Sequence, residues 1–144
     1  MKCAKEIVAV NEQVRSDHEK VRIANAMATH AEACKNAITY CETVIGPTFE
    51  EQAKSGCTLL SMYCRLRTRV DYFGNTHFDV IKTESYEHTV HHRDGTKSKI
   101  NKYRDAVVFS NIDKTTFVNY LDKHCYSCNI SGGYFTIKPK PSCN

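Results

Sequence analysis

The sequence of 144 residues lacks several features that would assign it to a common class. It has no apolar run long enough to span a bilayer, no glycine-rich loop for cradling phosphate and no nucleophile-elbow motif. Its first residues, MKCAKEIVAVNEQ, lack the apolar segment of a secretory signal. We therefore expect a cytoplasmic protein, and its eight cysteines are expected to be free thiols in a reducing compartment.

The composition is that of a folded protein with a mild positive charge. Apolar residues make up 41% of the chain, which is enough to bury a core. The length predicts one domain, with room for a helical extension. The net charge of +4 is smaller than is typical of a protein dedicated to wrapping nucleic acid.

Residues 2–45 contain neither proline nor glycine, and their apolar residues recur at helical spacing. Ser16 and Glu19 could form a capping box between two such stripes, which differ in phase. The segment is therefore one long helix or a helical hairpin. The first stripe consists of Ile7, Val10, Val14 and Val21, and the second of Met27, Ala31, Cys34, Ile38, Cys41 and Ile45.

A single helix of this length would reach roughly 60 Å, about twice the width of a small domain. It would therefore need a second surface, which its own folded-back half or a partner subunit could supply. Packing within one chain and a homodimer through the N-terminal helices both remain open. Gly46-Pro47 predicts the end of this segment, and a short helix from Thr48 to Ser55 with Gly56 as its C-terminal cap is expected next. The predicted division is a helical region, 1–46, and an α+β domain, 47–144.

The stretch Cys57 to Phe73 alternates between apolar and polar residues, which predicts a long β-strand. Gly74-Asn75 and Asp94-Gly95 predict hairpin turns, and the slip in alternation near Tyr103-Arg104 predicts a bulge or a break in the strand. A third helix is expected before a C-terminal hairpin. The fold class is therefore α+β, with an antiparallel β-meander after the N-terminal helical part.

The polar face of the predicted strand is the main candidate binding site. Guanidinium groups in a row can bind phosphates or carboxylates with paired hydrogen bonds, and a neighbouring tyrosine can stack on a base. The alternative is a solvated face paired with Asp79, Glu84 or Glu87. The candidate binding residues are Tyr63, Arg65, Arg67, Arg69, Lys97, Lys99, Lys102 and Arg104.

Two further clusters are candidate chemical sites. Cys125 and Cys128 have the spacing of half a zinc knuckle, but the sequence offers no second pair at standard spacing. The ligands that could complete such a site are His124, Cys143 and the histidines His88, His91 and His92. Those three histidines could act as acid and base, but without a nucleophile nearby they are interpreted as an exposed hairpin tip. The sequence therefore predicts no catalytic residue, cofactor or metal, with the metal-binding capacity of the cysteine pair left open.

Two runs carry a resemblance to a known group of proteins. AITYCETVIGPTFEEQAKSG, from Ala37 to Gly56, and the closing run TTFVNYLDKHCYSCNISGGYFTIKPKP resemble small accessory proteins of bacteriophages that infect gut Firmicutes. The resemblance covers less than half of the chain, and residues 72–110 look like an insertion relative to it. It implies a setting in which genes of this size encode inhibitors of host defence, including anti-CRISPR proteins.

These observations favour a non-enzymatic binding protein that inhibits a host protein, such as a defence nuclease, by covering its surface. The alternative is a protein that binds nucleic acid or a nucleotide through the face formed by Arg65, Arg67 and Arg69. Neither hypothesis requires a membrane. Both place the protein in the cytosol, which is the host-cell cytosol if the protein is phage-encoded.

Overall fold

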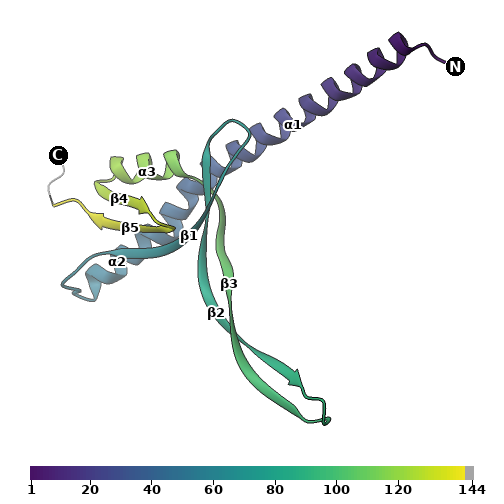
Figure 1. Ribbon diagram of the computed structural model, residues 1–144. Coiled ribbons are helices and arrows are strands. Elements are labelled where there is room, and N and C mark those ends of the chain that lie inside the picture. Colours follow the sequence, from purple (N-terminus) through teal and green to yellow (C-terminus); the bar gives the residue numbers. More distant parts are fainter. Residues whose placement is uncertain (142–144) are drawn as a thin grey trace.

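Residues 4–54 form one nearly continuous helical segment (Figure 1). The computed structural model describes residues 1–141. Helix α1 spans Ala4–Tyr40, the π-helical turn η1 spans Cys41–Ile45, and helix α2 spans Gly46–Lys54. The N-terminal region is therefore a single long helix rather than a helical hairpin.

The predicted helix end at Gly46-Pro47 is wrong because the wide turn η1 carries the chain through it. The backbone N–H of Gly46 donates to the carbonyl of Cys41, five residues back. Pro47 then lies directly after this wide turn, in the first turn of α2, which is a position that proline tolerates. The helix instead ends where Gly56 adopts a φ of 68°, as its predicted capping role requires.

Five strands form one antiparallel sheet in the order β3-β2-β1-β5-β4. Helix α3, Lys114–Lys123, connects β3 to β4, and the fold class is α+β as predicted. Asp113 caps α3 by accepting a hydrogen bond from the backbone of Thr116. The strands are β1 Met62–Val70, β2 Thr76–His91, β3 Lys97–Asp113, β4 Tyr126–Ser131 and β5 Tyr134–Pro139.

The pairing of β2 with β3 is regular where a bulge or a break was predicted. Tyr103 and Arg104 pair in continuous register with Ser85 and Glu84, so that prediction is wrong. The register shifts instead lie between residues 78 and 81 of β2, opposite residues 107–112 of β3. Asn111 has a φ of 56° there, which is the strained left-handed region that an irregular strand can contain.

The core lies between the sheet and the helices α1 and α3. The ring of Phe117 on α3 contacts Phe78 at a centroid distance of 5.2 Å and Phe135 at 5.6 Å. Tyr40 on α1 joins this group at 6.1 Å from Phe117, and all four rings are buried. This aromatic cluster fixes the helices on the sheet and so sets the positions of the residues discussed below.

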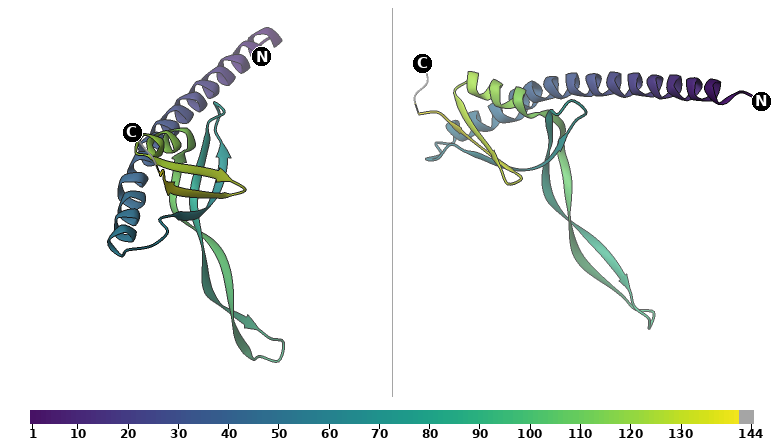
Figure 2. Two further views of the ribbon diagram at one scale, coloured as in Figure 1. Left: turned by 90° about the vertical axis from the view of Figure 1, so that its left-hand side faces the viewer. Right: turned by 45° about the horizontal axis from the view of Figure 1, so that its top comes forward.

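Two elements project from this body (Figure 2). One is the N-terminal half of α1, on which Ile7, Val10, Val14 and Val21 are all exposed. This stripe is therefore not packed into the protein's own core. The other is a two-stranded ribbon, residues 82–106, called the arm below. Pairing of β1 with β2 extends only to Ile81, so the arm strands pair only with each other.

No residue of the arm is buried. Core formation therefore does not explain why the arm is so long. Among residues 1–141, no helix combines the length and apolar content needed to cross a membrane.

Candidate functional site

The three predicted binding arginines lie side by side on β1, and each pairs with a carboxylate of the same chain. Arg65 donates two hydrogen bonds to Asp105 of β3, at 2.9 and 3.4 Å, and one to Thr83 at 2.6 Å. Both side chains of the Arg65–Asp105 pair remain more than one third exposed. The pair connects β1 to the base of the arm.

Arg67 and Arg69 share the carboxylate of Asp79 on β2, at 3.4 and 3.0 Å. Asp79 is only 8% exposed and also accepts a hydrogen bond of 2.8 Å from the backbone N–H of Asn111. Burial by itself would raise the pKa of Asp79, but the Asn111 bond and the two guanidinium groups outweigh it and lower the pKa below its usual range. Asp79 is therefore a charged residue of β2 that connects β1, through the two arginines, with β3, through Asn111.

These ion pairs match part of the alternative interpretation, in which the arginine face pairs with Asp79, Glu84 or Glu87. Asp79 does so, whereas Glu84 binds Arg104 and Glu87 binds Lys99. The arginine side chains still keep 38–60% of their surface exposed. The face formed by Arg65, Arg67 and Arg69 remains a predicted binding surface, and ion pairs within the chain compensate part of its positive charge.

Tyr63, the remaining predicted binding residue on β1, lies at the other end of this row. Its ring stacks on Tyr134 of β5 at a centroid distance of 5.0 Å and is 62% exposed. The pair forms an aromatic surface beside Arg65 of the kind that can stack on a planar group.

The other four predicted binding residues lie on the β3 strand of the arm rather than next to the arginines, because β2 separates β1 from β3. Arg104 binds Glu84 at 2.7 Å and lies over the ring of Tyr86. Lys99 approaches Glu87 at 3.8 Å. Lys97 and Lys102 form no ion pair within residues 1–141, so their charges are available to a partner.

The histidines His88, His91 and His92 lie at the far end of the arm and are exposed. His92 has its Nε2 atom 2.7 Å from the hydroxyl of Ser98. The interpretation of this segment as an exposed hairpin tip is confirmed.

The cysteine pair does not form half of a zinc knuckle. Cys125 is disulfide-bonded, so the expectation of a free thiol is wrong there. Cys128 is a free, half-buried thiol, and burial raises its pKa to about 11. The candidate ligand Cys143 lies outside the described residues.

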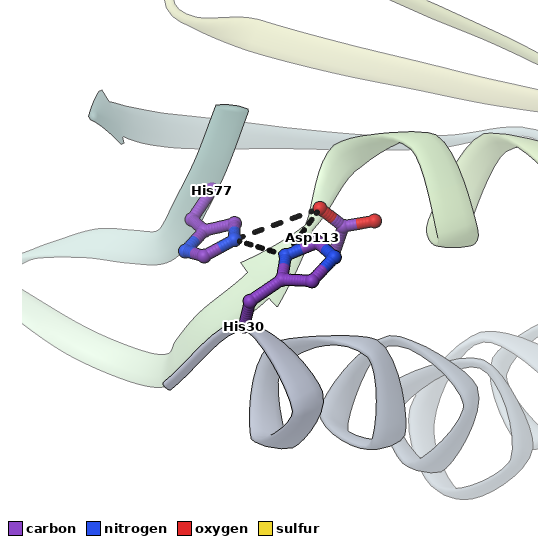
Figure 3. Close-up of side chains that lie close together, drawn as sticks. All are labelled: His30, His77 and Asp113. Carbon is purple, nitrogen blue, oxygen red and sulfur yellow. Dashed lines mark hydrogen bonds and ion pairs between the residues drawn. The ribbon is translucent and has the colours of Figure 1, made fainter. Parts of the chain in front are cut away.

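A different group of side chains converges where α1 crosses the sheet (Figure 3). Nδ1 of His30 and Nε2 of His77 lie 3.0 Å apart, and Oδ1 of Asp113 lies 3.7 and 3.6 Å from them. Oδ2 of Asp71 lies 3.8 Å from the first nitrogen and 3.4 Å from the second. These four residues are called the His–Asp cluster below.

Four separate segments supply the cluster. His30 comes from α1, Asp71 from the turn after β1, His77 from the start of β2, and Asp113 from the end of β3. His77 and Asp113 are buried, Asp71 is 10% exposed, and the His30 side chain is 32% exposed. The cluster is thus closed on the sheet side and accessible from the helix side.

Both carboxylates of the cluster are oriented by hydrogen bonds. Oδ2 of Asp113 accepts from the backbone N–H and the hydroxyl of Thr116, which turns Oδ1 toward the histidines. Asp71 accepts from the backbone N–H groups of Phe73 and Asn75. Burial would raise the pKa of Asp71, but the hydrogen bonds from Asn75 and Phe73 and the nearby His77 outweigh it and lower that pKa.

Sequence reasoning missed the cluster because its members are separated by at least six residues and follow no motif spacing. Only the tertiary contacts of α1 with the strands bring His30 to the other three. In a comparison with known proteins, no protein-family model, curated protein or solved structure gives a significant match to this chain.

Proposed function

We propose that this protein is a non-enzymatic binding protein that uses the arm to cover an acidic surface of a partner protein. The observation that carries the proposal is the arm itself, a ribbon in which no residue is buried. A long projection that adds nothing to the core is explained if it contacts another molecule.

The charges of the arm support an acidic partner surface. Six basic and four acidic residues give residues 82–106 a net charge of +2. Glu84, Glu87 and Asp105 form ion pairs within the chain, and Asp94 accepts hydrogen bonds from Thr96. The basic residues that form no ion pair within residues 1–141 are Lys82, Arg93, Lys97 and Lys102.

The apolar residues of the arm support a protein as the partner. Tyr103 is 71% exposed and Ile100 is 43% exposed. Exposed aromatic side chains such as that of Tyr103 anchor many protein interfaces. Within the arm, β2 and β3 pair only with each other, so the outer edge of each strand is open in the described part of the chain. A strand of the partner could therefore pair with either edge.

The resemblance to phage accessory proteins supports a specific setting for this proposal. In that setting the protein acts in the host-cell cytosol, and its partner is a host defence protein, such as a CRISPR nuclease. Inhibition is steric and electrostatic, with the arm covering a surface that the nuclease needs. Arg65, Arg67 and Arg69 lie at the base of the arm and would extend the contact. The exposed stripe of α1 is proposed to hold two copies together, a state that sedimentation would detect.

The test measures DNA cleavage by purified CRISPR nucleases of Firmicutes in the presence of the full chain. We expect inhibition that the double variant Lys97→Glu, Lys102→Glu weakens at least tenfold. The matched control is Lys2→Glu, Lys5→Glu, which makes the same charge change at the exposed N-terminus and should inhibit normally. If neither inhibition nor binding to any of these nucleases is observed, the proposal is wrong.

Nucleic acid is the second candidate partner, and the shape of the arm favours it. A two-stranded β-ribbon fits the major groove of DNA, and the unpaired lysines could contact phosphates. Binding of this kind would weaken steeply as salt is added. Titration of the chain with labelled DNA at several salt concentrations therefore separates this candidate from the protein-binding proposal.

A further inference from the structure

The His–Asp cluster lies outside the arm, so binding of a partner by the arm does not explain it. Its geometry points to a ligand. Within residues 1–141 Oδ1 of Asp113 accepts no hydrogen bond, and its distances of 3.7 and 3.6 Å to the two histidine nitrogens exceed hydrogen-bond range. Oδ2 of Asp71, which accepts a hydrogen bond of 3.1 Å from the side-chain amide of Asn75, lies 3.8 and 3.4 Å from the same nitrogens. Among these four side chains, His30 and His77 form the one hydrogen bond, at 3.0 Å.

A tetrahedral metal ion held by His30, His77 and Asp113 accounts for this spacing. Two ligand atoms that lie about 2.0–2.2 Å from such an ion are about 3.3–3.6 Å apart. Each of the two carboxylate oxygens lies 3.4–3.8 Å from both nitrogens, and the ligand atoms of His30, His77 and Asp113 all lie within 4.8 Å of one another. The two nitrogens lie closer together, at 3.0 Å, because they are hydrogen-bonded to each other, and a bound ion would replace that hydrogen bond.

The groups behind the ligand atoms resemble those that orient ligands in metal sites. Such sites hold each ligand with a hydrogen bond on its far side. Thr116 does this for Asp113, and the backbone N–H groups of the turn do it for Asp71. The far nitrogen of His30 lies 3.6 Å from the thiol sulfur of Cys34, one helical turn away.

We propose that the His–Asp cluster binds one divalent transition-metal ion, and that Zn²⁺ fits it best. The two imidazole nitrogens of His30 and His77 and the carboxylate oxygen of Asp113 suit Zn²⁺ and its neighbours, with Asp71 beside them, whereas Mg²⁺ and Ca²⁺ prefer ligand sets made of oxygen alone. Because His30 lies on α1 and the other ligands lie on the sheet and its turns, the bound ion ties the long helix to the sheet. This proposal is independent of the partner that the arm binds.

The test uses the full chain, freed of metal with a chelator and titrated with Zn²⁺ against a chromophoric competitor. We expect one ion per chain, a higher melting temperature with Zn²⁺, and the absorption of a four-coordinate ion when Co²⁺ replaces it. His30→Ala removes the most exposed ligand and should weaken binding at least tenfold. The matched control, His88→Ala, removes an exposed histidine of the arm and should bind normally.

Circular dichroism would establish that His30→Ala is folded. If it is not, Asp113→Asn serves instead, because its amide oxygen can still accept the two hydrogen bonds from Thr116 while the negative charge is lost. The proposal is overturned if the wild-type chain does not bind Zn²⁺ or Co²⁺, in which case the histidines only share a proton. It is also overturned if the variants that lose a ligand bind as tightly as the wild type, or if His88→Ala alone abolishes binding.

Discussion

Replacing Asp79 with asparagine removes one negative charge from the centre of the sheet and leaves the side-chain size unchanged. Asp79 holds Arg67, Arg69 and the backbone N–H of Asn111. Asn111 has a positive φ, and this hydrogen bond helps to hold the irregular part of β3 in place. The variant therefore tests whether this buried carboxylate fixes the register between β2 and β3.

The expected loss can be worked out from the three contacts. The arginine side chains are 60% and 45% exposed, so solvent screens the two ion pairs and they contribute about 0.4–2 kcal/mol together. The backbone bond becomes a neutral one, which lowers its contribution by about 1 kcal/mol. Asp79→Asn should therefore lower the free energy of unfolding at pH 7 by about 1.5–3 kcal/mol.

The measurement is urea unfolding of the wild type and the variant from pH 7 down to pH 3. Because the pKa of Asp79 is lowered in the folded state, its stabilisation is present above the unfolded pKa of about 3.9 and is lost as the pH falls through the folded pKa. The difference between the two proteins should therefore shrink in acid.

The control for this experiment is Asp105→Asn, which breaks the exposed pair with Arg65. We expect a much smaller loss, because both partners of that pair are in contact with water. Equal losses for Asp79→Asn and Asp105→Asn at pH 7 would refute the reasoning, and so would a loss for Asp79→Asn that does not change with pH.

Three further predictions concern the core and the helix end. Phe117→Ala should lower the free energy of unfolding by about 3–5 kcal/mol in urea titrations, because its fully buried ring contacts three other aromatic rings; a loss under 1 kcal/mol would contradict the described core. Burial raises the pKa of the Cys41 thiol to about 12, so at pH 8 Cys41 should react with a thiol reagent far more slowly than the exposed Cys3, as followed by mass spectrometry of peptides. Gly56→Ala should lower stability by about 1–2 kcal/mol in the same urea titrations, because alanine is strained at a φ of 68°; an unchanged midpoint would show that the helix end tolerates other conformations.

Much of the fold was predictable because local patterns determine it. The alternation around Leu66 predicted β1, the glycines Gly74 and Gly95 predicted the turns of two hairpins, and Gly56 predicted the end of the helical segment. In each case the signal lies within a few neighbouring residues. Backbone preference and the distribution of apolar side chains are sufficient to read it.

The features that were not predictable depend on contacts between distant parts of the chain. The helix passes through Pro47 because a wide turn precedes it, and no residue pattern indicates that turn. Arg65 pairs with Asp105 only because the register of β2 against β3 places them together, 40 residues apart in the sequence. The His–Asp cluster likewise forms only once α1 is packed against the sheet.

The claim that the arm is a binding element separate from the core is tested most directly by excising it. Residues 82–106 would be replaced by Asn-Gly, a two-residue turn that joins the paired residues Ile81 and Val107. Because no arm residue is buried, we predict a folded protein with a nearly unchanged melting temperature and no inhibition of the nuclease. Full inhibition by this folded, armless chain would contradict the account.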